Sequence, residues 1–253
     1  MTKSQIGADR RCAFGRERSS ATWRAFALAL VLVGTLSSCA RPVQAPVPTP
    51  EAVGERPVDT RGASVFAIDS DASRVHILVY RGGTLARLGH NHVVTSRSVS
   101  GRAWLHPQFE RSGFELSFPV ESLIVDDPDA RRAHGADFPP GISQKDIEGT
   151  RRNMLRPEVL NAQEFPTISV RSIDVKGALQ SPSVMARITI KGVAREKPVP
   201  LTLTLEGARL KAKGELDVLQ TEFGMKPFSI ALGALEVQDR LHLEFEIVAE
   251  RES

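Results

Sequence analysis

The sequence predicts an all-β protein: a single antiparallel β-barrel of about eight strands with one short helix. Three observations support this fold class. Apolar and polar residues alternate with a period of two through most of the chain from Ser64 to Glu250. Sixteen prolines and nineteen glycines indicate many turns and few long helices. One short stretch has the period of a helix instead, and the folded part is below 200 residues, a size that suits a closed barrel.

The alternation marks half-buried antiparallel strands. It is clearest at residues 74–80, 114–120, 183–191, 199–205, 208–218 and 240–250, and further strands fit near 91–105 and 167–176. The inward-facing sets consist mainly of leucine and valine, with the small residues Ala186, Ala212 and Gly214 among them. Eight strands enclose space for one small ligand or for side chains alone, and small residues are consistent with a hollow interior or with a tightly packed, tapering barrel.

The helix is expected at residues 143–156. Ser143 has the character of an N-cap residue and Asp146 follows three positions later. Ile147 and Met154 fall on one helical face, and Pro157 stops the helix.

The N-terminus has the pattern of a bacterial lipoprotein signal peptide. Residues 1–24 carry six basic residues, and residues 25–36 form an uncharged run too short to span a bilayer as a helix. Leu36-Ser37-Ser38-Cys39 resembles a lipobox, in which the cysteine sulfur receives diacylglycerol. We therefore expect residues 1–38 to be removed and Cys39 to be lipidated. The alternative is an ordinary signal peptide cleaved near Ala40.

Residues 39–63 are expected to be the lipidated cysteine and a spacer. Five prolines in residues 40–62 favour extended polyproline geometry. The domain then occupies residues 64–253. Because Ala40 is not aspartate, analogy with other lipoproteins favours the outer membrane, with the protein facing the periplasm.

The charge of the mature chain gives no argument for nucleic-acid binding, and no nucleic-acid partner is expected. The chain has 33 Lys and Arg against 30 Asp and Glu. Subtracting the six basic and two acidic residues of 1–38 leaves 27 against 28, so the basic pI belongs to the export segment. Cys12 leaves with that segment. The remaining Cys39 has no disulfide partner within the chain, and no cofactor is expected.

Five short motifs occur in order along the folded part: Phe66–Asp69, Gly89–His92 with Gly101-Arg102, Phe165–Ser172, Ile188–Arg195 and Thr221–Met225. Together they resemble the YceI-like family of exported bacterial proteins. The resemblance covers about residues 65–249 and implies an extended lipocalin-like β-barrel. It also implies non-catalytic binding of a long apolar lipid of isoprenoid type.

Eight residues are candidates for contact with such a ligand: His90, His92, Phe114, Phe118, Phe165, Phe223, Met225 and Phe228. Phe223, Met225 and Phe228 belong to a late apolar loop that can plug the barrel end or form a portal. A ligand-free structural or interaction module of the envelope is the alternative function.

His90 and His92 are two residues apart on an expected strand, so both side chains would face one way. This is half of a zinc or copper site, with His76 or Asp69 as a possible third ligand. The preferred interpretation is that the two histidines orient a ligand or a loop. Asp126, Asp127 and Asp129 lie in an extra segment, residues 126–141, and are expected to form a solvated turn. No Gly-x-Ser-x-Gly elbow or phosphate-binding loop occurs.

Overall fold

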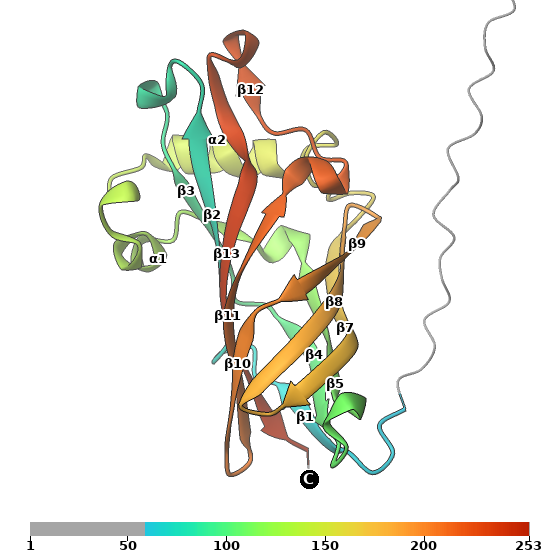
Figure 1. Cartoon of the computed structure of the whole chain (residues 1–253). Helices are drawn as coiled ribbons and strands as arrows, with labels where there is room; N and C mark the ends of the chain where they lie inside the picture. Colours follow the sequence, from blue (N-terminus) through green and yellow to red (C-terminus); the bar gives the residue numbers. More distant parts are fainter. Residues whose placement is uncertain (1–58, 253) are drawn as a thin grey trace, which may run out of the picture. The chain divides into compact units, whose positions relative to one another are not determined.

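The computed structural model describes residues 59–252. The expected signal segment, Cys39 and most of the proline-rich linker lie outside the described residues. The described part contains thirteen antiparallel strands and two α-helices (Figure 1). The strands are β1 Ser64–Ile68, β2 Arg74–Gly82, β3 His92–Ser96, β4 Ser100–Leu105, β5 Gly113–Pro119, β6 Ile124–Val125, β7 Thr167–Ala178, β8 Ser181–Ile190, β9 Val193–Val199, β10 Leu201–Glu206, β11 Arg209–Leu219, β12 Ser229–Ile230 and β13 Leu235–Arg251. The helices are α1 Pro128–Ala133 and α2 Gln144–Leu155.

The long last strand, β13, organises the sheet. On one side it pairs with β11 over eleven residues, and on the other it pairs with β2 and then with β1. From β13 the ladder continues through β1, β4, β5, β7, β8 and β9. The ladder is not closed by hydrogen bonds, since it ends at β9 and β10 pairs with β11 alone in the described part. The all-β barrel class is confirmed.

More strands occur than the eight expected because β1 and nearly all of β9 lie outside the alternating runs, and because two expected regions are interrupted. The run 199–205 is split at Pro200, which has no backbone N–H to donate to a ladder, so β9 ends before it and β10 begins after it. The region 91–105 is likewise two strands, β3 and β4. The two-residue strands β6 and β12 carry no alternation that a sequence pattern could reveal.

Alternating side chains separate the inside of the barrel from its outside. In β8, Val184, Ala186, Ile188 and Ile190 are buried while the residues between them are not, as the alternation predicts. Gly214 of β11 lies where a Cβ atom would come within 2.2 Å of the Pro200 carbonyl oxygen. This glycine therefore permits close approach of two strands and does not leave open space in the barrel.

Helix α2 has the predicted start and packing face. The Ser143 hydroxyl accepts a hydrogen bond from the Asp146 backbone N–H at 3.2 Å, which satisfies one free donor of the first turn. Ile147, Met154 and Leu155 pack against the largest buried cluster, so the helix covers one end of the barrel (Figure 1). Neither described helix is long and apolar enough to span a membrane.

The segment after β6 folds against the outside of the barrel. Helix α1 begins after Asp127, whose carboxylate accepts hydrogen bonds from two first-turn N–H groups, and Pro128 occupies a favoured first position. Ala130 and Phe138 pack on Leu78 and Val93, which face outward from β2 and β3. The segment 126–141 is therefore a docked element, and Figure 1 shows α1 beside these strands.

Candidate apolar binding cavity

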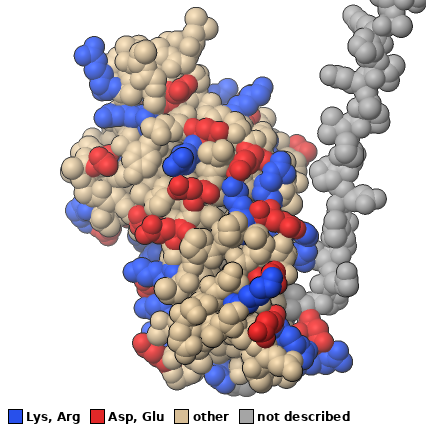
Figure 2. Space-filling view, viewed as in Figure 1, with Lys and Arg blue, Asp and Glu red and all other residues tan. Residues whose placement is uncertain are grey.

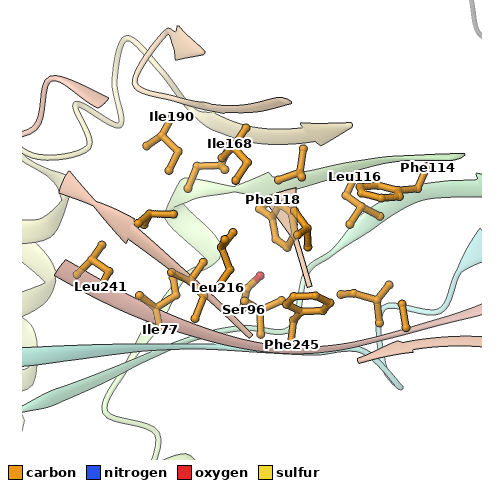
Figure 3. Close-up of a pocket in the computed structure, with 18 of the residues that line it drawn as sticks. Ile77, Ser96, Phe114, Leu116, Phe118, Ile168, Ile190, Leu216, Leu241 and Phe245 are labelled. Atoms are coloured by element: carbon orange, nitrogen blue, oxygen red, sulfur yellow. The ribbon is translucent and has the colours of Figure 1, made fainter. Parts of the chain in front are cut away.

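An apolar cavity of about 360 Å³ runs inside the barrel. This volume lies within the range of about 300–1,000 Å³ that is typical of small-molecule sites. Its walls come from β2, β11 and β13 on one side and from β5, β7 and β8 on the other, with Met154 of α2 at one end. Figure 3 shows Ile77, Leu216 and Phe245 facing Phe118 and Ile168 across the shared space.

The cavity is long and narrow. On β13 the lining residues are Val237 and, beyond the register shift between residues 237 and 241, an alternating run from Leu241 to Ala249. At about 3.3 Å per residue these eight steps span about 26 Å. A chain-like apolar ligand fits such a shape better than a compact one.

Few polar groups line the cavity, and most of them are already hydrogen-bonded. The Gln220 amide donates to the Gln238 carbonyl oxygen at 2.9 Å, and the Ser112 hydroxyl accepts from the His106 N–H at 3.0 Å. Ser96 differs, because its hydroxyl is buried without a hydrogen-bond partner among the described residues. Figure 3 shows that the Ser96 oxygen lies among carbon side chains.

Five of the eight ligand-contact candidates line this cavity: His92, Phe114, Phe118, Met225 and Phe228. Phe223 is fully buried in the core, and the late loop packs as a plug at this point. The ring of Phe165 lies over Gly192, where a Cβ atom would come within 2.6 Å of it. His90 is exposed and lines a separate polar pocket of about 120 Å³.

His90 and His92 do not share a strand, contrary to the sequence expectation. His90 lies before β3, and His92 is its first residue. The His92 Nδ1 atom lies 2.7 Å from the Asp126 carboxylate, while Asp69 accepts a hydrogen bond in the turn after β1. The proposed metal half-site is therefore not assembled by these residues.

Asp126 is buried, so the expectation of a solvated turn was wrong for this residue. Besides His92, its carboxylate contacts the Arg131 guanidinium at 2.5 Å and accepts from the Val93 N–H at 3.1 Å. Burial by itself would raise the pKa of Asp126. The hydrogen bonds from His92, Val93 and Arg131 outweigh burial and lower this pKa.

The His92–Asp126 pair is not placed for nucleophilic catalysis at Ser96. His92 and Ser96 are four residues apart on β3, which separates them by about 13 Å along the strand. A general base must lie within hydrogen-bond reach of its nucleophile. Instead, the pair fixes one end of β3 to the segment 126–141.

The structure brings His76 together with His134 and Glu244. His76 Nδ1 lies 2.9 Å from His134 Nε2, and His134 Nδ1 lies 3.8 Å from the Glu244 carboxylate. Burial, followed by the nearby His134, lowers the pKa of His76. This cluster was missed because its members are distant in sequence and His134 lies in the extra segment 126–141, for which no contact with the barrel was expected.

The surface shows no single-sign field on the face in Figure 2, where basic and acidic side chains are interspersed. Many charged side chains of the described residues form pairs, such as Arg187 with Glu196 at 2.7 Å. This distribution agrees with the near-neutral charge of residues 39–253.

One solved structure shows the same fold at low sequence identity, and two others match less closely. BcnA from Burkholderia cenocepacia is 17% identical with a TM-score of 0.54, and the match covers 72% of this chain and 99% of that one. A polyisoprenoid-binding domain from Saccharophagus degradans is 13% identical with a TM-score of 0.49, covering 74% and 98%. The YceI protein of Campylobacter jejuni is 11% identical with a TM-score of 0.44, covering 62% and 82%.

No curated protein matches the sequence. The YceI-like domain matches residues 66–249, which include nearly every strand described above. Because this match covers more than half of the chain, the protein belongs to the YceI-like family.

Proposed function

We propose that this protein binds a long apolar lipid of isoprenoid type in its barrel and carries it, without catalysis, at a membrane of the cell envelope. The cavity is the observation that supports this function. Its walls are almost entirely aliphatic and aromatic, so a ligand would gain affinity from buried area, at about 25 cal/mol per Å².

The shape of the cavity and the family membership favour an isoprenoid-like chain. A narrow cavity about 26 Å long accepts one extended chain, and His92 and Ser96 supply the few polar atoms that could orient it. The Saccharophagus degradans domain of similar fold is described as polyisoprenoid-binding.

The membrane part of the proposal rests on the lipobox ending in Cys39. A diacylglycerol on this cysteine, with or without a third chain, would hold the protein durably at the surface from which apolar cargo comes. The expected location is the periplasmic side of the outer membrane.

The test is to fill the cavity by mutation. Ala212 lines it, so Ala212→Phe places a ring in the ligand's space, whereas Ala194 is exposed and Ala194→Phe is the matched control. Native mass spectrometry of the full chain, released from membranes in detergent, should show bound lipid in the wild type and in Ala194→Phe. We expect about tenfold less in Ala212→Phe, equivalent to about 1.4 kcal/mol.

Two outcomes would contradict the proposal. Equal lipid occupancy in both variants would place the ligand outside the cavity. A wild-type protein without bound lipid, which also takes up no isoprenoid alcohol from vesicles, would favour the ligand-free structural module.

A further inference from the structure

We infer that His76, His134 and Glu244 form a binding site for a divalent transition-metal ion on the outer wall of the barrel, with zinc as the ion that the ligands suit best. Two imidazoles and one carboxylate are a ligand set that zinc commonly takes, leaving a fourth position for water. The site is separate from the lipid cavity and goes beyond the proposed function.

Two of the ligands are placed by strand pairing. His76 of β2 and Glu244 of β13 are directly opposite each other in the antiparallel ladder. Their neighbours Ile77 and Leu243 line the cavity, so His76 and Glu244 face the outside. Directly paired residues have Cβ atoms about 4.5–5.5 Å apart, which suits two ligands of one ion.

The third ligand comes from the docked segment. His134 follows α1, and its ring packs edge to face on the ring of the buried Phe138, with 5.8 Å between the ring centroids. Only 10% of the His134 side chain is exposed. The packing of Phe138 therefore holds His134 over the outer face of the sheet, toward His76.

The three side chains have metal-ligand spacing. One potential ligand atom from each lies within 4.8 Å of the other two. Tetrahedral zinc, with bonds of about 2.0–2.1 Å, holds its ligand atoms about 3.3 Å apart. This separation of about 3.3 Å lies between the 2.9 Å from His76 Nδ1 to His134 Nε2 and the 4.8 Å limit for all three ligand atoms. The ion would replace the proton that the two rings share.

A buried hydroxyl beside the cluster also lacks a partner. Thr95 of β3 pairs directly with His76 and faces the same side. Its Oγ1 atom is buried and has no hydrogen-bond partner in the part of the chain that the structure describes. A buried hydroxyl normally has a hydrogen-bond partner. A water on the open coordination position of the ion would supply this partner for Thr95.

The local charge also suits a cation. Glu244 supplies a carboxylate, and the nearby Arg97 is already paired with Asp127 at 3.1 Å. A bound ion would join β2, β13 and the segment 126–141, so it would stabilise the docked segment without touching the cargo.

The experiment uses zinc itself as the probe. The full chain in detergent is stripped of metal and titrated with Zn²⁺ against a chromophoric chelator, and Co²⁺ is then added to read its visible absorption. We expect one equivalent per chain and the intense bands of four-coordinate cobalt. Loss of a residue that only hydrogen-bonds to a metal ligand weakens metal binding by about 10–100-fold. His134→Ala and Glu244→Gln should each weaken zinc binding by more than this.

His90→Ala is the matched control, because His90 is an exposed histidine outside the cluster, and its zinc affinity should equal that of the wild type. Thermal melts of the metal-free proteins show whether each variant folds. If His134→Ala does not fold, Glu244→Gln still tests the site. The inference is overturned if the wild type binds no stoichiometric zinc. It is also overturned if both ligand variants bind zinc as tightly as the wild type, or if only His90→Ala loses binding.

Discussion

Asp126 and Arg131 form a buried ion pair in which each residue depends on the other. The Asp126 side chain is fully buried and that of Arg131 is 3% exposed. Because Asp126→Asn would leave the guanidinium charge without its partner, we expect a loss of about 3–5 kcal/mol in the free energy of unfolding at pH 7. Urea unfolding of both proteins measures this difference.

The same pair predicts how stability changes in acid. The pKa of Asp126 is lower in the folded than in the unfolded chain. Its contribution is therefore complete above the unfolded value of about 3.9 and is lost as the pH falls through the folded value. The difference in free energy of unfolding between wild type and Asp126→Asn should become smaller below about pH 4. A difference in free energy of unfolding that stays constant from pH 7 to pH 3 would contradict this account. The double variant Asp126→Asn with Arg131→Met should lose less free energy of unfolding than Asp126→Asn alone, because no guanidinium charge is then left unpaired.

Two buried serines give a paired prediction at the same scale. The Ser96 hydroxyl has no partner in the described residues, whereas the Ser73 hydroxyl donates to the Asp69 carbonyl oxygen at 2.7 Å and accepts from the Val248 N–H at 3.0 Å. A buried polar group without a partner costs about 1–3 kcal/mol. Ser96→Ala should therefore stabilise the lipid-free protein by about 1 kcal/mol, and Ser73→Ala should destabilise it by a similar amount or more. Denaturant titration of delipidated protein checks both signs, and destabilisation by Ser96→Ala would show that this hydroxyl is already satisfied.

At the scale of elements, sequence periodicity located the long strands because each buries one face. The alternating run 208–218 corresponds to β11, Arg209–Leu219, and the cap at Ser143 correctly marked the start of α2. Helix α1 was missed because six residues provide less than two turns of periodicity. Its signal was Asp127 followed by Pro128, an N-cap and a first-turn proline that also occur in turns.

Of the two sites, the sequence predicted residues that line the cavity but not the cluster of His76, His134 and Glu244. Strand alternation identified Phe114 and Phe118 as inward-facing, and both line the cavity. It could not identify the cluster of His76 and Glu244, because the two residues are joined by the β2–β13 pairing across 168 positions of sequence. Only the tertiary docking of residues 126–141 adds His134 to them.

The docked segment gives a prediction at this scale. Phe138 is 2% exposed and packs with Ala130, Leu78 and Val93 between the segment and the barrel. Phe138→Ala should cost about 3–5 kcal/mol if the segment unfolds together with the barrel. If the segment opens separately, amide exchange should rise in residues 128–138 while β11 and β13 stay protected. Unchanged exchange and unchanged stability would show that Phe138 does not hold the segment.

At the scale of the whole molecule, the proposed anchor and the cavity are parts of one arrangement. The near-neutral domain offers no strong electrostatic attraction to a membrane, so attachment would depend on the lipid at Cys39. If residues 40–58 took the extended geometry expected from their prolines, at about 3.1 Å each, they would give the domain a reach of about 60 Å from that lipid. This reach would let a single anchored protein take up and release cargo without detaching.

The anchor can therefore be removed without touching the cavity. In Cys39→Ser cells the protein should move from the membrane fraction to the soluble fraction of the envelope, because two or three acyl chains at about 0.8 kcal/mol per buried methylene no longer hold it. Cys12→Ser is the matched control: Cys12 lies in the segment expected to be removed, so this variant should stay with the membrane. Cell fractionation and the mass of the mature N-terminus measure both variants. Purified Cys39→Ser protein should still bind lipid as the wild type does, since residue 39 lies far outside the matched domain of residues 66–249. Membrane attachment of a Cys39→Ser protein from which residues 1–38 have been removed would contradict the anchor while leaving the cavity proposal intact.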